Sequence, residues 1–332
     1  MKYRPWGAAE WVLSLSNPKQ WHFIGAIGTE DRSLCAWSHM QTLGVISSAS
    51  FAQIHDADSE KYRERNRDAF VKRRNELVNN GGNLNSITTL NLMDELFQIA
   101  AFARKAENTN SSVVLDITSL PKRFFFPILR FLVNNPNVHN LLVTYTSPEC
   151  YADDAPLYED IESWKNLPGF GGTGNSKPEH WIVSVGFLVE SLRREIKDNP
   201  GHKVKILIPF PAPLAVLRRT WKSVAELEEG YENRHWFEKF RVDTLDMSAA
   251  FDRINSLANN PPKSLAFAPF GPKPTAAAMC LYALQRDSVS SVLYPQPTVY
   301  HPDYSKGVRN GDPATAVCAY WIKHEGEFLY SV

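Results

Sequence analysis

A polar turn made of residue types that bind phosphate follows a strongly apolar stretch in the first half of the sequence. The apolar run 113–115 ends in Asp116, and Thr118, Ser119 and Lys122 follow shortly after it. Hydroxyl side chains at a helix start cap its amides and can donate to an anion. A lysine there adds charge where helix-end amides already favour negative groups. The pattern predicts a buried strand leading to a helix through an anion-binding turn, suited to a phosphate or phosphodiester.

Strand-like and helix-like stretches alternate around this turn. We expect strands at 21–28, 44–53, 86–92, 113–116 and 138–145, and helices at 33–42, 56–80, 93–105 and 121–133. Such alternation is typical of a parallel sheet covered on both faces. In the usual doubly wound order the first and fourth strands are neighbours, and ligands bind beyond the carboxyl ends of the strands. The turn after the first strand, with Thr29, Glu30 and Arg32, should therefore face the same cleft as Asp116 to Lys122.

The second half of the chain repeats the order of features seen in the first. The stretch 181–186 matches 23–28, and Pro272-Lys273 matches Pro121-Lys122. Self-similarity on this scale predicts two copies of one unit. We therefore expect an α/β fold of two Rossmann-like units with mainly parallel sheets, arising from an internal duplication. The expected boundaries are 1–150 for the first unit, 151–178 for a Gly/Pro-rich connection and 179–332 for the second unit.

The second copy of the turn is reduced. It has no acid and keeps Lys273 as its cation after Gly271. Further on, Tyr300 and Tyr304 lie in a stretch rich in rings and polar groups, and such tyrosines can stack on a nucleobase. The alternative is an ordinary loop with anchoring tyrosines. The first turn has its own structural alternative, in which Thr118 and Ser119 only cap the helix and Arg32 pairs with a neighbouring acid.

Composition limits the classes of function. The 332 residues are 43% hydrophobic and 22% charged, and 36 basic residues balance 36 acidic ones. A globular fold is therefore expected, without an extended nucleic-acid surface. No apolar run is long enough to cross a bilayer, and the N-terminus does not resemble a signal peptide. The four isolated cysteines fit a reducing, cytoplasmic setting.

The sequence lacks the motifs of several common ligand and metal sites. The glycines near 169–174 follow no strand and precede no Gly-Lys-Ser/Thr, so they do not form a P-loop. Gly25 to Gly28 is not a dinucleotide fingerprint, and the histidines show no metal-ligand spacing. We therefore expect no cofactor and no metal. An enzymatic alternative would use Asp116 or Glu30 as general base or metal ligand, and Lys122 to stabilise developing charge.

The stretch Leu115-Asp116-Ile117-Thr118-Ser119-Leu120-Pro121-Lys122 resembles the strand-to-helix turn of CARF domains. Two such units in one chain resemble SAVED domains, which act as sensors in bacterial antiviral defence. The resemblance implies a cyclic oligonucleotide ligand held by Asp116, Thr118, Ser119 and Lys122, and by the turn from Thr29 to Arg32. This sequence departs from the CARF pattern at Leu120-Pro121, where that family has a small Gly-Thr pair.

We therefore expect a protein that binds a nucleotide-type ligand as a sensor or regulatory subunit, acting through a protein partner or by forming a homo-oligomer. The favoured function is binding rather than catalysis. A nucleotide-cleaving hydrolase or nuclease is the first alternative, and a structural subunit of a larger complex is the second.

Overall fold

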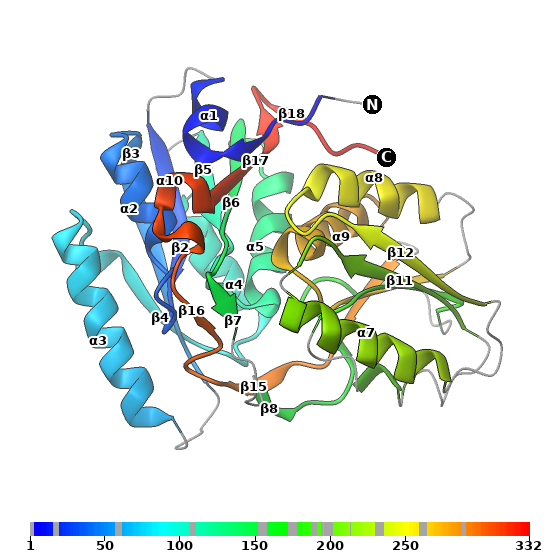
Figure 1. Cartoon of the computed structure of the whole chain (residues 1–332). Helices are drawn as coiled ribbons and strands as arrows, with labels where there is room; N and C mark the ends of the chain where they lie inside the picture. Colours follow the sequence, from blue (N-terminus) through cyan, green and yellow to red (C-terminus); the bar gives the residue numbers. More distant parts are fainter. Residues whose placement is uncertain are drawn as a thin grey trace. The chain divides into compact units, whose positions relative to one another are not determined.

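The computed structural model describes residues 3–15, 20–56, 62–106, 111–151, 158–171, 178–186, 191–193, 195, 202–212, 214–229, 236–258, 264–286 and 290–332. The chain forms two units (Figure 1). The first comprises Met1–Ile161 and Pro297–Leu329, and the second comprises Glu162–Gln296 and Tyr330–Val332. Among the described residues, no helix is both long enough and apolar enough to cross a bilayer.

The first unit contains most of the elements. These are β1 (Trp6–Ala8), α1 (Ala9–Ser14), β2 (Trp21–Ile27), α2 (Cys35–Thr42), β3 (Ile46–His55), α3 (Arg63–Asn79), β4 (Ile87–Asn91), α4 (Leu96–Ala103), β5 (Ser112–Asp116), α5 (Lys122–Asn134), β6 (Asn140–Thr146), β7 (Cys150–Tyr151), β8 (Tyr158–Ile161), β15 (Pro297–Tyr300), β16 (Ser305–Lys306), α10 (Pro313–Ala316), β17 (Val317–His324) and β18 (Glu327–Phe328). The strands and helices expected in this half are confirmed, with their ends shifted by a few residues. Part of one expected helix, at 57–61, lies outside the described residues.

The main sheet of the first unit has the order β1-β17-β6-β5-β2-β3-β4, and the strands from β6 to β4 run parallel. β2 lies between β5 and β3, so the expected pairing of the first and fourth strands is confirmed. β17 adds to β6 antiparallel, and Figure 1 shows the red β17 beside the green β6. The second unit was expected to reach residue 332, and this is wrong for Pro297–Leu329, because the buried apolar strand β17 pairs with β6.

The second unit contains β9 (Lys165–Asn166), β10 (His180–Ser184), β11 (Lys203–Pro209), α7 (Leu214–Glu229), β12 (Phe237–Val242), α8 (Met247–Ala258), β13 (Leu265–Pro269), α9 (Lys273–Gln285) and β14 (Ser290–Tyr294). Its sheet has the order β12-β11-β10-β13-β14-β9 and is parallel except for β9. In chain order within each unit, the parallel strands of both sheets are arranged 3-2-1-4-5. The chain is therefore an α/β protein with two Rossmann-like sheets, and the common order is what an internal duplication predicts.

The connection between the units carries some structure of its own. The expected Gly/Pro-rich segment 151–178 includes β8, which pairs with β15, and β9, which pairs with β14. The described units meet in sequence between Ile161 and Glu162. Residues 152–157 and 172–177 of this segment lie outside the described residues.

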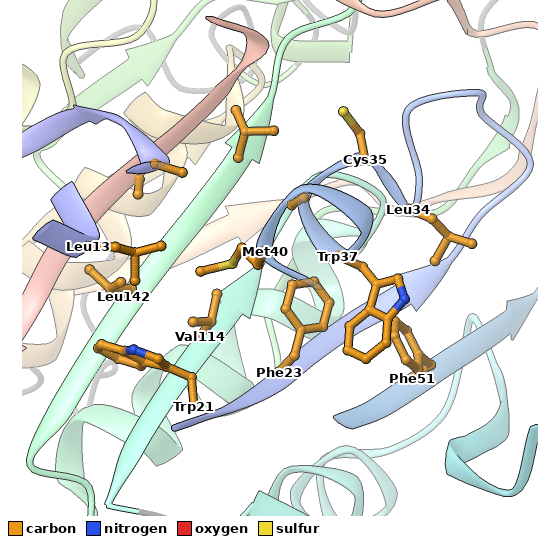
Figure 2. Packing of buried hydrophobic residues seen from close by; sticks show 14 of the residues in the cluster. Leu13, Trp21, Phe23, Leu34, Cys35, Trp37, Met40, Phe51, Val114 and Leu142 are labelled. Carbon is orange, nitrogen blue, oxygen red and sulfur yellow. The ribbon is translucent and has the colours of Figure 1, made fainter. Parts of the chain in front are cut away.

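A large apolar cluster of the first unit lies on one face of its sheet (Figure 2). Alternate residues of a strand face opposite sides of a sheet, and Trp21, Phe23 and Ile27 of β2 all join this cluster. The ring of Trp37 from α2 lies edge-on to Phe23, at 5.5 Å between ring centroids. Val114, Leu142 and Trp321 continue the same cluster from β5, β6 and β17. The aromatic face of β2 therefore fixes the strand at the centre of the sheet, where its carboxyl end meets that of β5.

The other face of β2 holds a buried histidine. His22 is 2% exposed. Its Nδ1 lies 2.8 Å from Ser48 Oγ, and its Nε2 lies 3.2 Å from Ser50 Oγ. Both ring nitrogens therefore have partners while the ring is neutral. Burial lowers the pKa of His22 from 6.5 to about 4.

This histidine makes the stability of the protein depend on pH. The unfolded chain binds a proton at His22 below pH 6.5, whereas the folded protein does not until pH falls to about 4. We therefore expect the contribution of His22 to be constant above pH 6.5 and to fall by about 3 kcal/mol as pH drops to 4. Urea unfolding at several pH values, with wild type and His22→Gln, measures this contribution as the difference between the two curves. A parallel pair of curves would contradict the prediction, and His139→Gln, at an exposed position, serves as the control.

Candidate functional site

The two turns predicted to face each other do meet at the carboxyl edge of the first sheet. Gly28 follows β2, and Ser119 lies in the turn after β5. A Cβ added to Gly28 would lie 2.8 Å from Ser119 Cβ and 2.9 Å from Ser119 Oγ. The Gly28 amide donates to Ser33 Oγ at 2.7 Å, which closes the first turn. Glycine is therefore required at position 28 because the turn after β5 occupies the space of a side chain.

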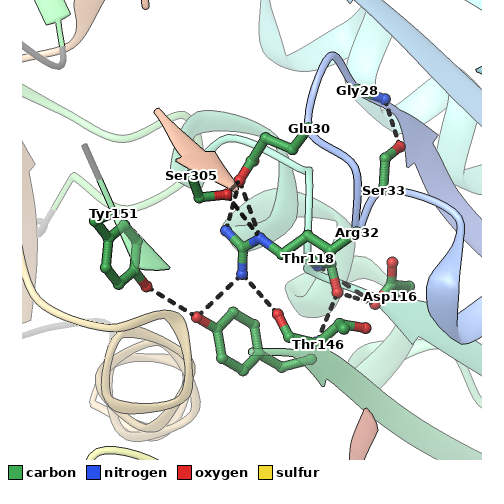
Figure 3. Close-up of polar contacts among 10 residues, drawn as sticks. Gly28, Glu30, Arg32, Ser33, Asp116, Thr118, Thr146, Tyr151 and Ser305 are labelled. Carbon is green, nitrogen blue, oxygen red and sulfur yellow. Dashed lines mark hydrogen bonds and ion pairs between the residues drawn. The ribbon is translucent and has the colours of Figure 1, made fainter. Parts of the chain in front are cut away.

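Asp116 is buried at the end of β5 and is bound by hydroxyl groups (Figure 3). Its Oδ1 accepts from Thr118 Oγ1 at 2.6 Å and from Thr144 Oγ1 at 3.0 Å. Thr118 Oγ1 in turn accepts from the amide of Thr146 at 2.9 Å. The side chain of Thr118 therefore donates its only hydrogen to Asp116 and has none for an anion. In this structure, both residues tie the turn after β5 to the end of β6.

Arg32, expected beside an anionic ligand, is 2% exposed and bound by protein groups. Its Nη2 lies 2.8 Å from Glu30 Oε2, and its Nη1 donates to the carbonyl oxygen of Thr146 at 2.6 Å. Nε also donates to Ser305 Oγ at 3.2 Å, and Ser305 Oγ donates to Glu30. Burial would lower the pKa of Arg32, but Glu30 and nearby tyrosines raise it well above its usual value. The pairing of Arg32 with a neighbouring acid, expected under the structural alternative, is found here as a buried pair with Glu30.

Three tyrosines enclose this buried pair. The Tyr145 hydroxyl lies 3.3 Å from Arg32 Nη1 and 3.3 Å from the Tyr151 hydroxyl. The Tyr304 ring stands at 90° to the Tyr151 ring, 5.8 Å between centroids. Burial raises the pKa of Tyr151 and of Tyr304. Tyr304 therefore packs against another tyrosine in this structure, as in the anchoring-loop alternative.

Tyr300, the other tyrosine expected to stack on a base, is half-buried at the end of β15. Its backbone bonds the carboxyl group of Asp56, which follows β3. Burial raises the pKa of Asp56 to about 6 despite this bond and another from Asn66. The segment 297–306 thus crosses the carboxyl ends of several strands of the first sheet, a placement that rests on contacts distant in sequence.

The remaining expected ligand residues lie nearer to the helix starts. Lys122 and Lys273 are the first residues of α5 and α9, and both are half-buried. Thr29 is half-buried in the turn after β2. The Ser119 hydroxyl is enclosed by protein and makes no hydrogen bond within the described part of the chain. Ser119 therefore differs from Thr118 in having a hydroxyl hydrogen that no described residue accepts.

The enzymatic alternative placed Asp116, Glu30 and Lys122 together. In the structure, Glu30 pairs with Arg32 and accepts a hydrogen bond from Ser305, and Asp116 accepts hydrogen bonds from two threonines. Within the described ranges, no group of three or more His, Cys, Asp or Glu side chains is arranged to hold a metal ion. These carboxyl groups therefore hold neighbouring segments together in this structure.

Several contributors to the polar edge were not among the predicted residues, including Tyr145 and Tyr151 and three hydroxyl residues. Thr144 and Thr146 come from the end of β6, and Ser305 from β16. The signal that could have found the threonines is polar side chains at the carboxyl end of a third parallel strand. Ser305 had no such signal, because its position depends on the return of the C-terminal segment to the first unit.

Comparison with known proteins does not assign this chain to a family. No family model and no curated protein matches the sequence. A universal stress protein from Archaeoglobus fulgidus DSM 4304 matches the structure with 10% identity and a TM-score of 0.25, covering 83% of this chain and 96% of that one. A putative universal stress protein from Pseudomonas aeruginosa UCBPP-PA14 matches with 14% identity and a TM-score of 0.26, covering 86% and 95%. The ketoreductase PlmKR1 from Streptomyces sp. HK803 matches with 11% identity and a TM-score of 0.22, covering 81% and 69%.

At these identities and TM-scores, the likenesses carry no argument about what this chain does. The Rossmann-like description of each unit therefore stands on its own strand order and on its parallel pairing.

The structural role of Thr118 can be tested by Thr118→Val, which keeps the shape of the side chain. The change leaves the Asp116 carboxyl group and the Thr146 amide each short of a buried partner. We expect a loss of about 2 to 3 kcal/mol in the free energy of unfolding, measured by urea titration. The control is Thr42→Val, whose exposed hydroxyl bonds only the preceding helical turn and whose loss should be within about 0.5 kcal/mol. Equal stability of the two variants would refute the assignment.

Proposed function

We propose that the first unit binds the phosphate group of a nucleotide-type ligand where the turns after β2 and β5 meet. The observation that carries this proposal is the enclosed Ser119 hydroxyl, which lies against Gly28 and has no hydrogen-bond partner in the described structure. A buried polar group without a partner is uncommon in native proteins and calls for an explanation. A ligand oxygen that accepts from Ser119 would supply the missing bond.

The surroundings of Ser119 favour an anion. The turn leads into α5, whose first amides lack partners within the helix and carry the positive end of its dipole. Lys122 is the first residue of that helix. Ligands in open parallel sheets bind beyond the carboxyl ends of the strands, where the strand order reverses, and β2 and β5 flank that point. In this proposal Thr118, Asp116 and Arg32 position the turns, and Ser119 and Lys122 contact the ligand.

The turn sequence supplies the finer part of the proposal. Because Leu115 to Lys122 resembles a CARF turn, cyclic oligonucleotides are the first ligands to test, and a sensor or regulatory subunit is the role that such a ligand would imply. This role rests on that stretch alone. A protein partner or a second copy of the chain would then carry the signal.

The binding site can be tested with Ser119→Ala and Lys122→Gln. Thermal unfolding in the presence of inorganic phosphate, ATP and a panel of cyclic oligonucleotides identifies the ligand that stabilises the wild type. We expect each variant to weaken binding of that ligand about tenfold, or about 1.4 kcal/mol, because a charge-assisted bond is lost. Ser119→Ala should fold at least as stably as wild type without ligand, since it removes a hydroxyl that lacks a partner.

Lys222→Gln, which removes a lysine that is 79% exposed on α7, should bind like the wild type. Wild-type affinity in both Ser119→Ala and Lys122→Gln would overturn the proposed site. Ligand turnover that disappears in Asp116→Ala would favour the hydrolase alternative. If no member of the panel stabilises the protein, the structural-subunit alternative is favoured.

A further inference from the structure

The second unit has its own strand-order reversal, built with the same close approach. β10 lies between β11 and β13, and Gly186 follows it. A Cβ on Gly186 would lie 1.9 Å from the carbonyl oxygen of Phe270, in the turn that leads to α9. A Cβ on Gly271 would lie 1.9 Å from Ser184 Oγ. Both glycines are therefore needed where the turns after β10 and β13 meet.

Two buried hydroxyl groups lie at this reversal without partners. Ser184 ends β10 and Thr275 is in the first turn of α9, and both side chains are 0% exposed. Neither hydroxyl makes a hydrogen bond within the described residues. Alanine and valine would fill the same volumes without leaving a polar group unpaired, so packing alone does not account for them. Two unsatisfied donors at one corner of the unit indicate a partner that the folded chain does not itself supply.

The charges near these two hydroxyl groups favour an anionic partner. Lys273 begins α9, and the amides of the first helical turn carry the positive end of the dipole. The segment 265–275, which forms β13 and the start of α9, contains no acid. In the first unit, by contrast, Glu30 and Asp116 lie near the corresponding turns. An anion at the second reversal would therefore meet hydroxyls and a lysine with no carboxylate from that segment opposing it.

We infer that the second unit binds a phosphate-type oxyanion at the start of α9, with Ser184 and Thr275 donating hydrogen bonds and Lys273 providing the opposing charge. This site was expected to be only a reduced counterpart of the first. The inference does not depend on the proposed function, because its residues all belong to the second unit. Free phosphate and the phosphate group of a nucleotide share this chemistry, so the experiment uses both as probes.

The test measures binding of inorganic phosphate and of AMP to the full chain by equilibrium dialysis. Thr275→Val and Ser184→Ala alter the second-unit site. Lys122→Gln alters the proposed first-unit site, so that binding at the two sites can be told apart. We expect Thr275→Val and Ser184→Ala each to weaken one class of sites at least about tenfold, for whichever probe binds. Both variants should unfold at the wild-type temperature or above it in the absence of either probe.

Thr244→Val is the matched control, because its hydroxyl already donates to the carbonyl oxygen of Pro211 in the same unit. It should lower the unfolding temperature and leave phosphate binding unchanged. Loss of a site in Lys122→Gln but not in Thr275→Val or Ser184→Ala would overturn the inference while the first site stands. Loss of a phosphate site in Thr275→Val and Ser184→Ala, with no loss in Lys122→Gln, would support the inference and contradict the proposed site in the first unit. The inference also fails if neither probe binds the wild type.

Discussion

A buried carboxyl group at the end of β5 governs how the first unit is built. Asp116 lies among strands, out of contact with water, and a polar group in that position has to be bonded. Thr118 and Thr144 supply those bonds, and through Thr118 the amide of Thr146 is held as well. The turn into α5 is thereby fixed to the end of β6. Because this turn also lies against Gly28, one network sets the geometry where β2, β5 and β6 end.

The order of the parallel strands follows from features that are local in sequence. Short apolar runs separated by helix-forming segments predicted each of the parallel strands β2 to β6, and the parallel α/β class then placed the first of them beside the fourth. The location of β17 could not be predicted in this way. Its residues, 317–324, are mostly apolar like the strands of the second half, and their pairing with β6 and β1 assigns them to the first unit.

The candidate site was predictable in its residue types and less so in their roles. Asp116, Thr118 and Arg32 do gather at the carboxyl edge, as strand-end positions predict. Their bonding could not be foreseen, because the partners come from β6 and from Ser305, far along the chain. Side chains of the types that bind phosphate also form hydrogen bonds with buried backbone groups. Ligand binding and internal bonding can be told apart only by listing which donors and acceptors already have partners. The hydroxyl groups without partners, Ser119 in the first unit and Ser184 and Thr275 in the second, lie where the strand order of each sheet reverses.

The path of the chain has a consequence for biosynthesis. The second unit is inserted between two parts of the first, because the chain leaves at Ile161 and returns at Pro297. A ribosome therefore makes residues 162–296, nearly all of the second unit, before it makes β17, the strand that pairs with both β1 and β6. Domains generally fold as they are made. During that interval β6 is an exposed sheet edge, a hazard for aggregation. The main sheet of the first unit is therefore completed only after residues 162–296 have been made, although its synthesis begins first.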